Sequence, residues 1–301
     1  MEKFLPSYVN CLQSGELAQR VQRAWEQLSA CRGCGWHCGV NRRGNELGKC
    51  RTGELARVSS YGPHLGEERP LSGWKGSGTI FFARCNLKCQ FCQNYTISQL
   101  DEGGEVDARG LAAIMLELQE YGCHNINLVS PSHVVPQILA AVALAAQAGL
   151  RLPLVYNSGG YDSLDMLCLL DGVVDIYMPD LKYAGEEIAR KYSGIPNYPE
   201  VNRAAVREMF RQVGDLQITG GLAFRGLLVR HLVLPDRLAG TSEIVRFLAE
   251  EISKSTYLNL MDQYYPAFCA HLFPEINRRI SREEYQEAVQ QAQKAGLYRL
   301  D

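Results

Sequence analysis

From Ser77 onward, short apolar runs alternate with segments whose apolar residues recur at helical spacing. Short continuous apolar runs are typical of strands that are buried on both faces, and their alternation with helices predicts a parallel sheet with crossover helices. Six strands are fewer than the eight of a complete (βα)8 barrel, so we expect an incomplete α/β barrel. The six runs are "GTIFFA" (78–83), "NINLVS" (125–130), "LPLVYN" (152–157), "VDIYMP" (174–179), "LLVRHLVL" (227–234) and "YLNLMD" (257–262).

Helix boundaries are visible between and after these runs. Asp107 is placed to cap a helix that ends at Gly122, and the next helical segment stops at Gly149. Near the end of the chain, Ser281 and Glu284 are spaced as a capping box at the start of a helix that runs to residue 296. These signals support the alternating pattern.

Three regions differ in their pattern. We expect a cysteine-rich extension over residues 1–76, an α/β core over 77–265 and a helical extension over 266–301. The 301 residues carry a formal net charge of −2 without a long block of one sign, so we expect neither a nucleic-acid nor a membrane partner. No segment approaches the roughly 20 apolar residues of a membrane span, and no signal peptide is evident, so the expected location is the cytoplasm.

Seven of the eleven cysteines form two clusters, and the other four stand alone. An odd number in a chain without a secretion signal favours metal binding or redox chemistry over disulfides. Cys85, Cys89 and Cys92 follow the first expected strand directly, which places them over its carboxyl end, where chemistry collects in α/β folds. A closed structural zinc site would use a fourth ligand near by. Three thiolates leave one metal position open for a substrate or cofactor, although a zinc loop is an alternative interpretation.

The C-x3-C-x2-C spacing, with Phe91 before the third cysteine and a strand before the first, resembles the radical S-adenosylmethionine superfamily. The resemblance implies a partial (βα)6 barrel and a 4Fe-4S cluster held by Cys85, Cys89 and Cys92, with Phe91 beside the cofactor. It also implies that the fourth iron binds S-adenosylmethionine, whose reductive cleavage gives a 5′-deoxyadenosyl radical. A low-potential electron donor such as flavodoxin or ferredoxin is the implied partner.

Further strand ends resemble the glycyl-radical activating branch and its PflX-like relatives, which are similar to the pyruvate formate-lyase activating enzyme. The segments that carry this likeness are "YNSGGY", "YMPDLKY" and "RHLVLP". By this match, Asn157, Ser158, Asp180, Lys182 and His231 would face the adenosylmethionine. The alternative for Asp180 and Lys182 is an ordinary ion pair, and for His231 a hydrogen-bonded, partly buried position.

The chain departs from the superfamily after the second expected strand. Where a Gly-Gly-Glu-like turn usually holds the methionine amine, it reads "SPSHV". The hydroxyls or carbonyls of Ser130 and Ser132 are the expected acceptors in its place, without the charge that a glutamate would supply.

The second cluster lies near the start of the chain. Its four thiols, in the spacing C-x2-C-x3-C-x11-C, could close a tetrahedral metal shell, because the interleaved glycines permit tight turns. We expect a structural zinc site, with a second 4Fe-4S cluster as the alternative. The four ligands would be Cys31, Cys34, Cys38 and Cys50.

Two classes of function follow. The first is an enzyme, a radical S-adenosylmethionine oxidoreductase that abstracts hydrogen from a substrate, with a protein or peptide glycine as one candidate. The second is a non-enzymatic iron-sulfur carrier or zinc-stabilised adaptor. Polar strand ends at Asp180, Lys182 and His231 favour the enzyme, since a carrier has no use for them. Asn259, Asp262 and Gln263 lie near the last strand's end, where a substrate could enter.

Overall fold

The computed structural model describes residues 4–301 and contains one nine-stranded mixed sheet. Six strands are parallel and follow the chain order β2, β4, β5, β6, β8 and β9, as the apolar runs predict. The expected α/β barrel of six parallel strands is therefore confirmed. The strands are β1 (Ala56–His64), β2 (Ser77–Phe82), β3 (Gly104–Val106), β4 (Ile126–Val129), β5 (Leu154–Ser158), β6 (Ile176–Pro179), β7 (Gln217–Thr219), β8 (Leu222–Leu232) and β9 (Tyr257–Met261).

Three further strands extend the sheet beyond the expected six. β1 pairs antiparallel with β2 and β3, and β7 forms an antiparallel pair with the first half of β8. Because β1 belongs to the amino-terminal region, the boundary expected at residue 76 falls between two hydrogen-bonded strands. The first 76 residues thus contribute a strand to the core sheet.

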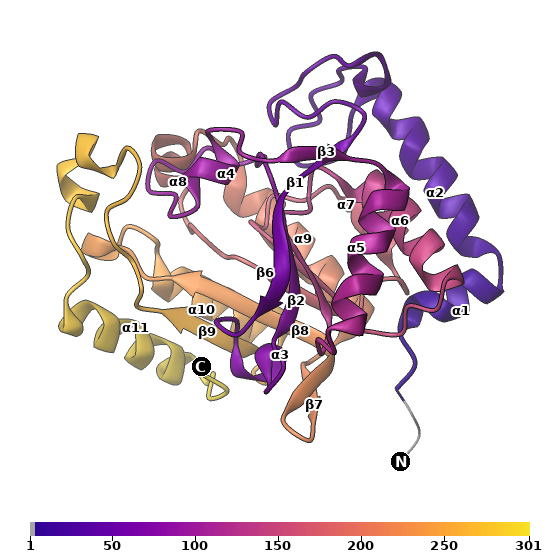
Figure 1. Ribbon diagram of the computed structural model, residues 1–301. Coiled ribbons are helices and arrows are strands. Elements are labelled where there is room, and N and C mark those ends of the chain that lie inside the picture. The colour runs from indigo at the N-terminus through magenta and orange to yellow at the C-terminus, as the bar shows by residue number, and fades with distance from the viewer. Residues whose placement is uncertain (1–3) are drawn as a thin grey trace.

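Helices cover the outside of the sheet (Figure 1). Helix α5 begins at Asp107, whose side chain accepts a hydrogen bond from the backbone N–H of Gly110, and α11 begins at the predicted Ser281–Glu284 capping box. The helices of seven residues or more are α1 (Ser7–Gln13), α2 (Glu16–Glu26), α5 (Ala108–Glu120), α6 (Val135–Gln147), α7 (Leu164–Leu170), α8 (Glu186–Ser193), α9 (Tyr198–Val213), α10 (Thr241–Phe247) and α11 (Arg282–Ala295); short helical turns are α3 (Arg69–Ser72) and α4 (Tyr95–Ser98).

The amino-terminal helices α1 and α2 add an outer layer over α6, on the side of the sheet opposite α11 (Figure 1). The Tyr8 hydroxyl donates to the carbonyl of Leu152, and the Ser7 N–H donates to the buried Asp175 carboxylate. These bonds attach α1 to the amino ends of β5 and β6. In residues 4–301, no helix combines the length and apolar character that crossing a bilayer requires.

Alternate residues on each parallel strand face two different environments. In β5, Leu154 and Tyr156 pack under the helices, whereas Val155 joins a separate inner cluster with Ile176 and Leu228. The residue two positions after each of these inner-facing side chains therefore also points toward the barrel interior, at the carboxyl edge of the sheet. This alternation decides which polar strand-end residues reach the site.

Candidate functional site

A cavity of about 370 Å³ opens at the carboxyl edge of the parallel strands. Its lining brings together five of the expected cofactor-binding positions and all three thiols of the first cysteine cluster. The expected residues that line it are Cys85, Cys89, Cys92, Ser130, Asn157, Ser158, Asp180 and Lys182.

The cysteine loop between β2 and α4 has little regular structure, and distant segments hold it in place. The backbone N–H groups of Lys88 and Gln90 donate to the carbonyls of Ser193 and Tyr192, which end α8. The Ser193 hydroxyl donates to the Cys89 sulfur at 3.0 Å. The loop geometry is therefore supported by α8 from outside the β2–β4 unit.

The three thiols suit a soft metal cluster. Burial raises the pKa of Cys85, and it raises that of Cys89 to about 12, so both thiols stay protonated until a metal binds. Within residues 4–301, no group of three or more His, Cys, Asp or Glu side chains surrounds one point closely enough to hold a single metal ion. Soft thiolates are the ligands of iron-sulfur clusters, in which each thiolate binds a different iron.

Asp180 and Lys182 follow β6 and form an ion pair inside the cavity, with 2.6 Å between Lys182 Nζ and Asp180 Oδ2. Their side chains are only 19% and 18% exposed. Although burial opposes the charged form, the neighbouring Asp180 carboxylate raises the pKa of Lys182. Lys182 therefore keeps its positive charge beside the thiols.

The turn after β5 approaches the cysteine loop closely because it contains two glycines. A Cβ on Gly159 would lie 2.2 Å from Leu87 Cδ1 in that loop. Gly160 has φ +74° and a Cβ there would lie 2.3 Å from the carbonyl of Asp180. Glycine is required at position 160, because the left-handed backbone and the Asp180 carbonyl leave no room for a side chain, whereas a side chain at position 159 would have to displace Leu87 of the cysteine loop.

Three expected cofactor contacts lie outside the cavity. The His231 ring nitrogens bond to the carbonyl of Leu181 at 2.6 Å and to the Thr241 hydroxyl at 2.9 Å, and burial lowers the pKa of His231 to about 4. Phe91 packs among buried aromatic side chains, and the buried Ser132 lies beside Asp162. His231, Phe91 and Ser132 thus do not line this cavity, and their contact with adenosylmethionine stays a prediction.

Strand geometry explains why His231 points away from the cavity. Adjacent side chains on a strand point to opposite faces, so only one of Arg230 and His231 can face the barrel interior. Arg230 shares the inner face with Leu228 and lines the cavity, whereas His231 shares the outer face with Val229. Because both faces are buried, the apolar pattern of the run did not reveal which residue points inward.

Sequence reasoning also missed Glu67 and Glu68, which follow β1. Glu67 lines the main cavity, and both carboxylates line an adjoining cavity of about 330 Å³. Burial raises the pKa of Glu67 to about 7, Arg230 opposes this shift and Glu68 adds to it. The only sequence signal was the pair of consecutive acids in "GEERP" (66–70), upstream of the first expected strand (78–83).

The amino-terminal cysteine region docks on the cysteine loop. The Trp36 indole N–H donates to the carbonyl of Asn86 at 2.7 Å, and the Asn86 amide donates to the carbonyl of Tyr161 at 2.8 Å. Cys34 forms a β-bridge with Asp162. This region therefore supports both the residue after Cys85 and the turn after β5.

The four amino-terminal thiols do not settle the identity of a metal. Cys31, Cys34 and Cys50 are buried, and Arg42 extends its guanidinium to 3.9 Å from the Cys31 sulfur. No carboxylate within residues 4–301 forms an ion pair with the fully buried Arg42. The structural zinc site at these four thiols, with a second 4Fe-4S cluster as its alternative, stays a prediction.

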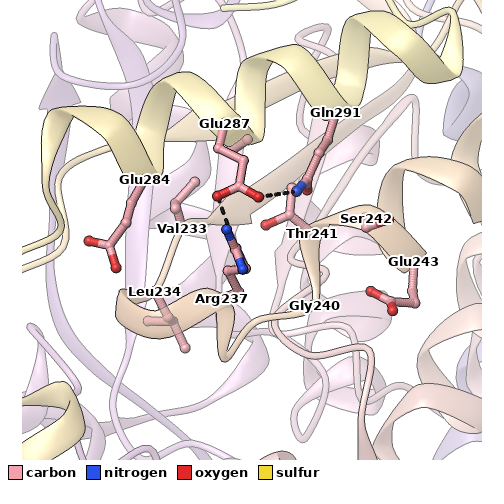
Figure 2. Close-up of a pocket in the computed structure, with 11 residues that line it drawn as sticks. Val233, Leu234, Arg237, Gly240, Thr241, Ser242, Glu243, Glu284, Glu287 and Gln291 are labelled. Carbon is pink, nitrogen blue, oxygen red and sulfur yellow. Dashed lines mark hydrogen bonds and ion pairs between the residues drawn. The ribbon is translucent and has the colours of Figure 1, made fainter.

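Another cavity, of about 230 Å³, lies between α11 and the connection from β8 to α10 (Figure 2). Arg237 in its wall donates to Glu287 at 2.9 Å, and Gln291 donates to the same carboxylate. None of its lining residues is a cysteine. The chemistry therefore belongs to the cysteine-lined cavity.

Comparison with known proteins agrees with this geometry. The family model of the radical SAM superfamily matches residues 79–222, from β2 to the start of β8, with all three loop cysteines inside the match. An uncharacterized protein of Methanocaldococcus jannaschii, MJ0674, is 32% identical over 286 residues, which cover 92% of this chain and 78% of that protein. The chain belongs to the radical SAM superfamily.

Two solved structures are similar in fold. A radical SAM methyltransferase from Sphaerobacter thermophilus has a TM-score of 0.50 at 17% identity; the match covers 74% of this chain and 65% of that one. The chain thus spans slightly less than two thirds of the methyltransferase. A domain of pyruvate-formate lyase-activating enzyme from Bacteroides vulgatus has a TM-score of 0.38 at 13% identity, with 64% and 89% covered.

The chain is accordingly a radical SAM enzyme, for which the superfamily implies a 4Fe-4S cluster and S-adenosylmethionine. When bound, the cluster and adenosylmethionine supply a 5′-deoxyadenosyl radical, and an external reductant supplies the electron. Cys85, Cys89 and Cys92 would hold the cluster, and the cavity walls would orient the adenosylmethionine and exclude water.

Glu67 gives a testable pH dependence. Its carboxyl is 8% exposed, and its pKa is about 7 in the folded chain against an ordinary value of 4.5. The folded state therefore binds more protons than the unfolded state between these values, so the free energy of unfolding should fall by up to about 3 kcal/mol as pH rises from 4.5 to 7. Urea unfolding of wild type and Glu67→Gln across this range measures the difference.

Glu67→Gln should lack this fall, while Glu250→Gln, at an exposed carboxyl on the outer surface, should behave as wild type. Taking the difference between variants removes the shared titrations of His133, His231 and Asp175. Parallel pH profiles for wild type and Glu67→Gln would contradict the assignment.

Proposed function

We propose that this enzyme belongs to the PflX-like, activating-enzyme-like branch and abstracts a hydrogen atom from a substrate held beside the cysteine loop. The observation that carries the proposal is the meeting of three thiols and the Asp180–Lys182 pair in one cavity of about 370 Å³. A carrier or adaptor protein would have no use for a buried ion pair aimed at its thiols.

Asp180, Lys182, Asn157 and Ser158 are the proposed contacts to adenosylmethionine. The carboxylate and hydroxyl can accept hydrogen bonds from ribose hydroxyls, and the ammonium can donate to a carboxylate. Ser130, which has φ +60° and donates its N–H to the carbonyl of Asn157, presents backbone and hydroxyl to the cavity at the position of the usual Gly-Gly-Glu-like turn. These roles rest on the residues' shared lining and on the sequence resemblance.

A protein or peptide glycine is the proposed substrate class. The adjoining cavity, which shares Gly66, Glu67, Arg230 and Gln263 with the main one, gives a substrate segment access past β9. Abstraction would break a Cα–H bond, form the new C–H bond of 5′-deoxyadenosine and leave the unpaired electron on the glycine. A flavodoxin or ferredoxin is the proposed electron donor.

The cluster assignment is tested by substituting one thiol. Cys89→Ala in anaerobically reconstituted protein should lose iron-sulfur absorption and reduce adenosylmethionine cleavage at least 100-fold, because a ligand of the cluster is lost. Cys123→Ala is the matched control, since Cys123 is an equally buried cysteine remote from the cavity, and it should keep both signals. Wild-type cleavage by Cys89→Ala would refute the assignment.

The glycine substrate is tested by isotope transfer. Turnover with a peptide deuterated at a glycine Cα should place deuterium in 5′-deoxyadenosine, whereas the same peptide deuterated at an alanine Cα should not. If a small metabolite supplies the label and no glycine peptide does, the glycine proposal fails and the radical enzyme stands.

The amino-terminal metal is tested by analysis of the triple variant Cys85→Ala, Cys89→Ala, Cys92→Ala. About one equivalent of zinc retained by Cys31, Cys34, Cys38 and Cys50 would support the structural zinc site. Cys34→Ser should then lower the melting temperature, because metal binding there is coupled to local folding. Iron with sulfide in the triple variant would identify a second cluster in its place.

A further inference from the structure

Three carboxylates surround one guanidinium where the two adjoining cavities meet. Arg230 NH1 lies 3.7 Å from Glu67 Oε2, and its Nε lies 3.3 Å from Glu68 Oε1 and 3.8 Å from Asp180 Oδ1. The side chains of Glu67 and Glu68 are only 8% and 2% exposed. These groups come from the segment after β1, from β8 and from the end of β6, so the fold builds the cluster from three separate regions.

The charges in this cluster do not balance. Lys182 lies 2.6 Å from Asp180 and neutralises it. Glu67 and Glu68 then share the single positive charge of Arg230. Without a cationic ligand, the excess carboxylate is relieved only by protonation of Glu67, whose pKa burial raises to about 7. His64 approaches Glu67 only at 3.8 Å, and the remaining neighbour on β4, Asn127, is neutral.

The adjoining cavity repeats this excess. Its acidic lining residues outnumber the basic ones, since Arg69 and Arg230 face Glu67, Glu68, Asp262 and Asp301. A ligand that approaches past β9 therefore meets a negative wall before it reaches the cysteine-lined cavity. Such a field favours the approach of a cation.

Hydrogen-bonding capacity is also unused here. Glu68 Oε1 accepts from the Asn259 amide at 2.8 Å, but Glu68 Oε2 has no hydrogen-bond partner among residues 4–301. The completely buried Asn127 side chain, a neighbour of Glu67, likewise has no hydrogen-bond partner within the described residues. A buried polar group without a partner is unfavourable, so a ligand that donates to Glu68 Oε2 supplies the hydrogen bond that the site lacks.

We propose that Glu67 and Glu68 form the subsite for a cationic amino group of the substrate, oriented by Arg230 and reached through the cavity beside β9. An ammonium offers three N–H donors, and ionised carboxylates are acceptors only, so the two groups match. One positive charge on the ligand also balances the excess carboxylate. This inference rests on the proposed function, because it identifies one group of the substrate that the proposed enzyme would bind.

The test uses anaerobically reconstituted protein with adenosylmethionine bound and three small probes of matched size: n-butylammonium, n-butanol and butyrate, at constant ionic strength. Thermal denaturation measures binding, since a ligand that binds only the folded state raises the melting temperature. Butylammonium should raise it in a saturable way, and the other two probes should not.

Glu67→Gln and Glu68→Gln should each weaken butylammonium binding at least tenfold, and Glu250→Gln should leave it unchanged. Glutamine at position 68 keeps an acceptor for Asn259, and Glu67→Gln provides an independent arm if that variant folds poorly. Preference for butyrate, or no binding by any probe, would overturn the proposal.

Adenosylmethionine affinity and cleavage are measured in the same samples. If Glu67→Gln weakens adenosylmethionine binding by the same factor as butylammonium binding, the pair serves the cofactor and the subsite is refuted. If wild type binds butylammonium as expected but forms no 5′-deoxyadenosine, the subsite stands and the proposed function fails.

Discussion

The site depends on a hydrogen-bonded contact at Asn86, the residue that follows the first cluster cysteine. Its side chain donates to the carbonyl of Tyr161, and its own carbonyl accepts from the indole of Trp36. A loop without regular secondary structure is thereby attached to the turn after β5 and to the amino-terminal region. Because it fixes the cysteine loop against that turn, this contact brings the thiols, Asn157 and Ser158 into one cavity.

Much of the fold could be predicted from the apolar pattern, because buried parallel strands are marked by local sequence. All six expected strands exist, and the caps at Asp107 and Ser281 are where the side chains indicated. Helices α1 and α2 and strand β1 were not predicted. Helix α2 buries only Leu17 and Ala24 on a polar background, and β1 is half exposed along an antiparallel edge, so neither carries a continuous apolar run.

The candidate site was predictable to a smaller extent. The cysteine loop and the ends of β5 and β6 could be placed at the cavity, because the apolar run of each strand marks in the sequence where that strand ends. The direction in which a side chain points could not be predicted for β8. Arg230 and His231 belong to one apolar run that is buried on both faces, and only the pairing of β8 with β6 and β9 decides which of them points inward. Glu67 and Glu68 were missed because charged residues after a strand usually indicate a solvated turn, whereas here the barrel wall encloses them.

The Asn86 contact also constrains the order in which the chain acquires its final form. Trp36 and Asn86 are 50 positions apart, and Asn86 and Tyr161 are 75 apart, so this junction closes long loops and forms only after the polypeptide beyond β5 is available. During synthesis the amino-terminal cysteine region and the cysteine loop therefore emerge before either has its docking surface. The hydrogen bonds from the end of α8 come later still in the chain, so we expect the loop thiols to stay open to solvent until residues 192 and 193 have folded against them.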